Sequence, residues 1–154
     1  MYSKEQASAL RKEFWTSFGL FMKPVLSAEY QRINWVSYKT GVKGIDLKLV
    51  ADQNEAYLMI EIKTKDLDIK NLLFEQFLEF KSLFSNEVGA DWEWIQQDFN
   101  EFGQERALIK SQMVKSNIYN NMEWDIPFGF LKTNLIAFDS FWENAREVFK
   151  DLVK

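Results

Sequence analysis

The chain has 154 residues, of which 47% are hydrophobic and 27% are charged, and its formal net charge is −4. This composition is typical of a single folded domain over residues 1–154 and excludes a disordered chain. Cysteine and histidine are both absent, which excludes disulfides, thiolate chemistry and every triad that needs an imidazole. Without cysteines, a signal peptide or a long apolar run, we expect a cytoplasmic protein with no membrane partner.

The first predicted element is an amphipathic helix. Ser3 and Gln6 have the spacing of a capping box, and apolar residues then recur at helical spacing. The helix must end before Pro24. A short run of strand-forming residues follows at Ile33–Tyr38 and leads into Thr40-Gly41, which predicts a strand closing in a turn.

Alternating apolar and polar residues predict a β-hairpin next. The alternation runs through Ile45–Val50 and resumes in Tyr57–Ile62. A loop at Gln53-Asn54 fixes the register between these two segments. On one face of the hairpin this register pairs Ile45 with Ile62, Leu47 with Ile60 and Leu49 with Leu58.

The second half of the chain begins with another predicted helix. Asp68 can serve as its N-cap, and Gly89 stands where a left-handed residue would end it. Alternation in Trp92–Gln96 and a second apolar run in Arg106–Met113 predict a second hairpin.

The last predicted element is a long amphipathic helix over Leu131–Leu152, which Pro127 and Gly129 separate from a short turn. The resulting element order is α-β-β-β-α-β-β-α. This order predicts an α+β fold in which an antiparallel sheet of about five strands has helices packed on one face. The seven-residue apolar repeat of the last helix would also suit a homodimer, although the same stripe is needed for the chain's own core.

Three side chains of the first hairpin suggest a metal-dependent reaction. In the predicted register, Asp46 faces Glu61 on the side opposite the apolar stripe, and Lys63 follows on that same side. This arrangement resembles that of PD-(D/E)XK nucleases, in which carboxylates hold Mg²⁺ and a lysine assists the attacking water. On this hypothesis all three residues are catalytic, and Asp46 and Glu61 bind the metal.

The same residues also have a purely structural interpretation. Charged residues commonly alternate on the outer face of a sheet, and Lys48, Lys63 and Lys65 can offset the repulsion between Asp46 and Glu61. Under this interpretation no cofactor is needed.

Two further groups of residues are candidates for binding. Trp92 and Trp94 could present a surface on which bases, sugars or peptide side chains stack, although such rings are often core residues. Lys48 is a further candidate for binding. Lys63–Lys65, near Lys43 and Lys48, could form a small basic patch for phosphate contact, although it could equally be a solvated face. The net charge of the whole chain does not favour nucleic acid.

Several motifs together resemble those of one bacterial family, called domain of unknown function 4268. They span nearly the whole chain: Glu13-Phe14-Trp15, Ile33-Asn34-Trp35, Gly41-Val42-Lys43-Gly44, Ile60-Glu61-Ile62, residues 74–81, 89–94 and 138–146. The resemblance implies a domain that occurs alone, as here, and also as a C-terminal module behind a nuclease-like domain. It therefore favours an accessory role.

Together these observations predict a non-catalytic interaction or accessory module that serves a nucleic-acid-related or defence system. The alternative is a Mg²⁺-dependent nuclease built on Asp46, Glu61 and Lys63. The sequence leaves the ligand and any protein partner open, because no residue set in it demands one specific chemistry.

Overall fold

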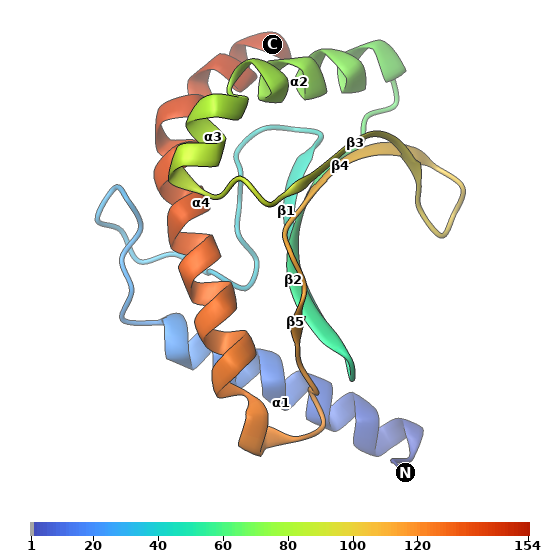
Figure 1. Cartoon of the computed structure of the whole chain (residues 1–154), viewed down its shortest axis with the longest axis vertical. Coiled ribbons are helices and arrows are strands. Elements are labelled where there is room, and N and C mark those ends of the chain that lie inside the picture. The colour runs from blue at the N-terminus through green and yellow to red at the C-terminus, as the bar shows by residue number, and fades with distance from the viewer. Residues whose placement is uncertain (1) are drawn as a thin grey trace.

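A computed structural model describes residues 2–154 (Figure 1). The elements in chain order are α1 (Lys4–Met22), β1 (Ile45–Ala51), β2 (Glu55–Ile62), α2 (Leu67–Glu79), α3 (Lys81–Glu87), β3 (Glu93–Phe99), β4 (Glu105–Lys110), β5 (Val114–Lys115), the short 3-10 helix η1 (Asn121–Glu123) and α4 (Asp125–Leu152). The strands form one antiparallel sheet in the order β1-β2-β4-β3, and β5 pairs with the first residues of β2. The predicted α+β fold is confirmed.

The β1–β2 hairpin has the predicted register. Ile45 lies opposite Ile62, and the pairing continues without a shift to Ala51 and Ala56. The turn is held by Asp52, whose carboxylate accepts the backbone N–H groups of residues 54 and 55 at 2.7 and 2.9 Å. The apolar residues at every second position of the two strands therefore predicted this pairing correctly.

The β3–β4 hairpin projects from the rest of the sheet (Figure 1). Its register shifts between Ile95 and Asp98, which is the signature of a β-bulge in β3. At the tip, the Asn100 side chain accepts the N–H groups of residues 102 and 104, both at 2.9 Å, and Gly103 has φ +75°. The second predicted hairpin is therefore confirmed, with an irregularity that the sequence pattern did not indicate.

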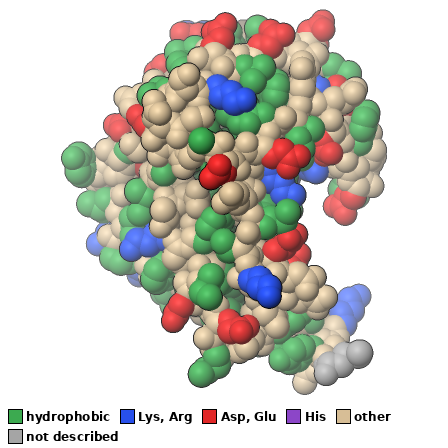
Figure 2. Space-filling model, in the orientation of Figure 1, with side chains coloured by type: hydrophobic (Ala, Val, Ile, Leu, Met, Phe, Trp, Pro, Cys, Tyr) green, Lys and Arg blue, Asp and Glu red, His purple; other side chains and the backbone are tan. Residues whose placement is uncertain are grey.

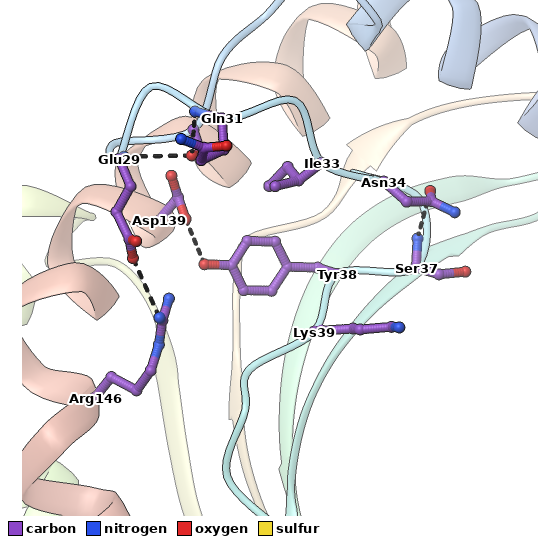
Figure 3. Close-up of a pocket in the computed structure, with 10 residues that line it drawn as sticks. Glu29, Gln31, Ile33, Asn34, Ser37, Tyr38, Lys39, Asp139 and Arg146 are labelled. Atoms are coloured by element: carbon purple, nitrogen blue, oxygen red, sulfur yellow. Dashed lines mark hydrogen bonds and ion pairs between the residues drawn. The ribbon is translucent and has the colours of Figure 1, made fainter.

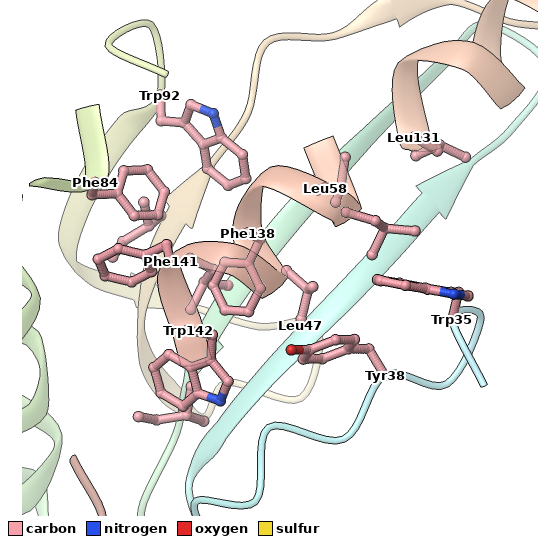
Figure 4. Packing of buried hydrophobic residues seen from close by; sticks show 14 of the residues in the cluster. Trp35, Tyr38, Leu47, Leu58, Phe84, Trp92, Leu131, Phe138, Phe141 and Trp142 are labelled. Carbon is pink, nitrogen blue, oxygen red and sulfur yellow. The ribbon is translucent and has the colours of Figure 1, made fainter. Parts of the chain in front are cut away.

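The helices cover one face of the sheet, and the core lies between the two layers (Figures 1 and 4). From the sheet, the apolar stripe of the first hairpin faces the helices. From α4, one continuous stripe is fully buried and consists of Leu131, Leu135, Phe138, Trp142, Ala145 and Phe149. Figure 4 shows Phe138 and Trp142 of α4 close to Leu47 of β1. Aromatic rings from both layers thus fill one continuous cluster.

The opposite side of α4 is mainly polar. It exposes Ser140, Glu143, Asn144 and Glu147. Because the apolar stripe of α4 is used for the chain's own core, a homodimer through that stripe would need another apolar surface. The homodimer stays a prediction. None of the helices in residues 2–154 combines the length and apolar character that crossing a membrane requires.

One predicted strand is not present. Residues 33–38 form an irregular loop instead of a strand. The Asn34 side chain accepts the N–H groups of Val36 and Ser37, which bends the chain, and the Trp35 indole N–H donates to the Val25 carbonyl at 3.0 Å. Trp35 and Tyr38 are buried. These aromatic residues pack the loop against the core and do not belong to a paired strand.

Two helix boundaries also differ from the predictions. The helix expected from Asp68 is capped by Asp66 and is divided into α2 and α3 at Phe80, whose ψ of 6° interrupts the helical backbone. The last helix begins at Asp125, before Pro127. Proline is tolerated there because the first turn of a helix has no internal partner for its N–H groups.

Candidate functional site

The side of the sheet that the helices leave open carries the predicted catalytic residues. Asp46 of β1 lies directly opposite Glu61 of β2, as the predicted register requires. Figure 2 shows the molecule hollowed beside the β3–β4 hairpin, with acidic and basic side chains together around the hollow. The chemistry that is available at this site depends on the contacts of the Glu61 carboxylate.

Glu61 forms ion pairs with two cations. Its side chain is only 2% exposed, and its carboxylate contacts Lys48 Nζ at 2.9 Å and Arg106 Nη1 at 2.7 Å. Arg106 also contacts Asp98 through Nε, at 2.8 Å. Burial alone would raise the pKa of Glu61, but the hydrogen bonds and positive charges of Arg106 and Lys48 hold it below its ordinary value. Arg106, which the sequence analysis missed as a partner, is therefore central to this network.

Lys63 does not contact Glu61 through its side chain. Its ammonium donates to the Gln104 side chain in the β3–β4 loop at 3.3 Å. Across residues 2–154, His, Cys, Asp and Glu side chains nowhere form a group of three or more that could hold a metal ion. A metal held by Asp46 and Glu61 would have to displace Arg106 and Lys48. The catalytic and metal-binding roles of these residues stay predictions.

The nuclease alternative has a direct test. It expects a highly pure preparation to cleave DNA with Mg²⁺ or Mn²⁺, and it expects Asp46→Ala to abolish cleavage because a metal ligand is lost. Asp46 is exposed, so this substitution should change the free energy of unfolding by no more than about 0.5 kcal/mol. Asp151→Ala, at another exposed aspartate, is the matched control. A pure wild-type protein that cleaves no DNA would contradict the alternative.

The predicted aromatic surface lies largely within the core. Trp92 is 8% exposed and packs edge-on against Phe84, with 5.2 Å between ring centres. Trp94 is half-buried, contacts the same Phe84 ring and carries the Lys81 ammonium 5.2 Å from its ring centre. Lys48 is on the other face of the sheet, with Glu61. The roles of Trp92, Trp94 and Lys48 in binding stay predictions.

Four lysines surround a hollow at the end of the first hairpin, which we call the lysine hollow. Its volume is about 370 Å³, and its lining consists of Lys43, Gly44, Lys63, Thr64, Lys65, Ile69, Leu152, Val153 and Lys154. The structure thus brings together the lysines on either side of the first hairpin, as expected for a basic patch. Lys154 joins them from the end of α4, whereas Lys48 is paired elsewhere.

Gly44 makes the close approach within the lysine hollow possible. The Lys63 N–H donates to the Gly44 carbonyl at 2.9 Å, which joins the two segments that carry the lysines. Gly44 has φ +94°, and an added Cβ would lie 2.7 Å from the Thr64 side chain. Only glycine fits both the conformation and the space.

A second hollow, which we call the loop pocket, lies between α4 and the loop that precedes β1 (Figure 3). Its volume is about 380 Å³, and its lining consists of Ser27, Glu29, Gln31, Ile33, Asn34, Ser37, Tyr38, Lys39, Asp139 and Arg146. Most of these side chains are polar. No sequence motif indicated this pocket, because its residues come from an irregular loop and from the flank of a helix.

Asp139 anchors the loop to α4. Its carboxylate is buried and accepts the Ala28 N–H at 2.7 Å and the Tyr38 hydroxyl. Burial raises the pKa of that hydroxyl, and the acceptor Asp139 raises it further. Tyr30, between the lining residues Glu29 and Gln31, has φ 61°, a left-handed conformation that is uncommon outside glycine.

These observations define an α+β domain whose antiparallel sheet carries helices on one face, with two polar hollows along its last helix. The chain belongs to the family described as "Domain of unknown function (DUF4268)", whose model matches residues 10–146. The resemblance indicated by the motifs is thus confirmed. No curated protein and no solved structure matches the chain.

Proposed function

We propose that this chain is an accessory module that binds phosphate groups of a nucleic acid at the lysine hollow. One observation carries the proposal. Four of the nine lining residues are lysines and none is acidic, although the protein as a whole has a net charge of −4. Contacts to phosphates supply most of the affinity in sequence-independent nucleic-acid binding.

The charge of the lysine hollow is largely unneutralised. Within residues 2–154, Lys43 and Lys65 have no ion-pair partner. Lys63 contacts only a neutral amide, and Lys154 pairs with Asp151 at 3.4 Å between two exposed side chains, a contact that contributes little. By contrast, the basic residues around Glu61 are paired with carboxylates. The lysine hollow is therefore the better site for an anion.

The remaining lining suits a nucleic acid better than a bare anion. Ile69, Leu152 and Val153 form an apolar side of the lysine hollow, against which a sugar or a base can pack. Lysines bind phosphates as mobile point charges, without the fixed geometry of an arginine fork. We therefore expect binding that depends on charge and salt, with little dependence on base sequence.

An accessory role in the bacterial cytoplasm is part of the proposal. The absence of cysteine supports the cytoplasm. The family resemblance, which implies a module that also occurs behind a nuclease-like domain, supports the accessory role. In this role the module would hold the nucleic acid, and a separate protein partner would carry out the chemistry.

The test is binding of a short labelled single-stranded DNA, measured by fluorescence anisotropy. The triple variant Lys43→Glu, Lys65→Glu, Lys154→Glu reverses three of the four charges of the lysine hollow. The control variant Lys4→Glu, Lys12→Glu, Lys115→Glu has the same net charge, but its substitutions are at exposed lysines elsewhere. We expect only the first variant to lose affinity. We also expect the slope of log affinity against log salt concentration to fall in magnitude by about 2, because about 0.7 is lost per phosphate contact on a single strand.

Two outcomes would contradict the proposal. Equal affinity in the two triple variants would show that overall charge, and not the lysine hollow, attracts the DNA. Binding of inorganic phosphate at the lysine hollow without any binding of DNA would show that the ligand is a small phosphate compound. Circular dichroism of each variant confirms that it is folded.

A further inference from the structure

We propose that the loop pocket is a separate binding site for a small carboxylate, which is held by the Arg146 guanidinium. Arg146 Nε is buried, yet it has no hydrogen-bond partner in the described part of the chain. Buried polar atoms are normally satisfied, so an unpaired donor beside a cavity calls for an acceptor. Arg146 is one of the residues that line the loop pocket.

The other side chains of the loop pocket leave Arg146 as the group available for binding. Asp139 already accepts two hydrogen bonds, from the loop backbone and from Tyr38, and it forms no ion pair with Arg146. Arg146 Nη1 donates to Glu29 at 3.2 Å (Figure 3), and the guanidinium lies near the Tyr38 hydroxyl, whose pKa it lowers against the larger effect of burial. Because a guanidinium has five N–H donors, most of its capacity is unused by these contacts.

Glu29 occupies part of the place that a ligand carboxylate would take. Its side chain is 53% exposed and makes one contact with Arg146, so water competes for it. Once Glu29 has moved away, a ligand carboxylate could accept two parallel bonds from the guanidinium, because the guanidinium fork matches carboxylate geometry. We expect such a ligand to displace Glu29.

The backbone around Glu29 is already fixed, so little ordering is needed when a ligand binds. The Ser27 N–H donates to the Gln31 carbonyl at 2.8 Å, and the Ser27 hydroxyl oxygen accepts the N–H groups of residues 29 and 31. The left-handed Tyr30 lies within this turn. A conformation of this kind persists only where its surroundings hold it, and it is commonly found beside ligand sites.

The size and charge of the loop pocket set the class of ligand. Its volume lies within the range of small-molecule sites. Glu29 and Asp139 balance Lys39 and Arg146, so the lining does not attract a polyanion in the way that the lysine hollow does. A small organic acid with one or two carboxylates and further polar groups fits this lining. The two hollows share no lining residue, so this proposal does not rest on the one made above.

The arginine Nε–H signals in a ¹⁵N NMR spectrum test the proposal at the atom concerned. The chain has four arginines, and the signal missing from Arg146→Lys identifies Arg146. On titration with acetate and then with succinate, we expect this signal to move and to saturate. Arg106 Nε already donates to Asp98 at 2.8 Å, so its signal serves as the internal control and should stay in place.

Two variants distinguish ligand binding from a structural role of Arg146. Arg146→Lys should weaken succinate binding by about tenfold or more, because the bidentate contact is lost. Glu29→Gln should strengthen it, because the competing carboxylate is gone. Arg32→Lys is the matched control and should change nothing. If the Arg146 signal does not move, or moves without saturation together with those of the other arginines, the proposal is overturned.

Discussion

Trp142→Ala is expected to lower the free energy of unfolding by about 3 to 5 kcal/mol, which is the range for deleting a large buried aromatic side chain. Trp142 has no exposed surface and packs against Phe77, Phe138 and Phe149 at ring-centre distances of 5.1 to 6.0 Å. Its indole N–H also donates to the Thr40 carbonyl at 2.7 Å. The variant therefore loses packing and leaves a buried carbonyl without its donor. Equilibrium unfolding in urea measures the change.

Two controls separate the contributions at Trp142. Trp142→Phe keeps most of the ring volume but removes the N–H donor, so it should show a smaller loss than the alanine variant. Val148→Ala, at a half-exposed position on the same helix, should change the free energy of unfolding by no more than about 0.5 kcal/mol. If Trp142→Ala cost as little as Val148→Ala, α4 would not pack as described.

Replacing Glu61 is expected to remove stability in a pH-dependent way. Its pKa in the folded protein is below the ordinary value of about 4.3, because Arg106 and Lys48 outweigh the effect of burial. A lowered pKa means that the stabilisation is complete above the ordinary pKa and is lost as the pH falls through the lowered one. Glu61→Gln keeps the shape but not the charge, so it should be less stable than wild type at pH 7.

The comparison with wild type across pH completes this prediction. The difference between wild type and Glu61→Gln should shrink as the pH falls below the ordinary carboxyl pKa and through the lowered pKa of Glu61, where wild-type Glu61 also becomes protonated. Glu61→Ala should cost about 2 to 3 kcal/mol at neutral pH, because Arg106 retains Asp98 and Lys48 is half-exposed. A difference between wild type and Glu61→Gln that is constant from pH 7 to strong acid would contradict the ion-pair interpretation.

Local sequence patterns were sufficient for the start of α1 and for the first hairpin. The capping box at Ser3 and Gln6 is present at the start of α1, because it depends only on residues three positions apart. The β1–β2 register was also predictable, because a slip of one residue would turn Ile45 and its neighbours away from the core. Residues 33–38 were wrongly predicted as a strand. A loop that buries aromatic residues such as Trp35 has the same amino-acid composition as a strand.

Contacts between distant segments were not predictable in the same way. Arg106 contacts Glu61 only because β4 pairs with β2. These strands are far apart in the chain, and no local pattern in the sequence predicts that they pair. Arg146 and Asp139 meet a loop more than 100 positions earlier in the chain. The lysine patch was predictable where its members flank one hairpin, whereas Lys154 could be placed only by the packing of α4.

The bulge in β3 limits how the sheet can extend. β3 forms one border of the sheet, and a uniform row of free N–H and C=O groups at such a border would serve as a template for a strand from another molecule. The register shift between Ile95 and Asp98 breaks the regular spacing of that row. A straight foreign strand could match β3 over only part of its length, so fibril growth from this border is disfavoured.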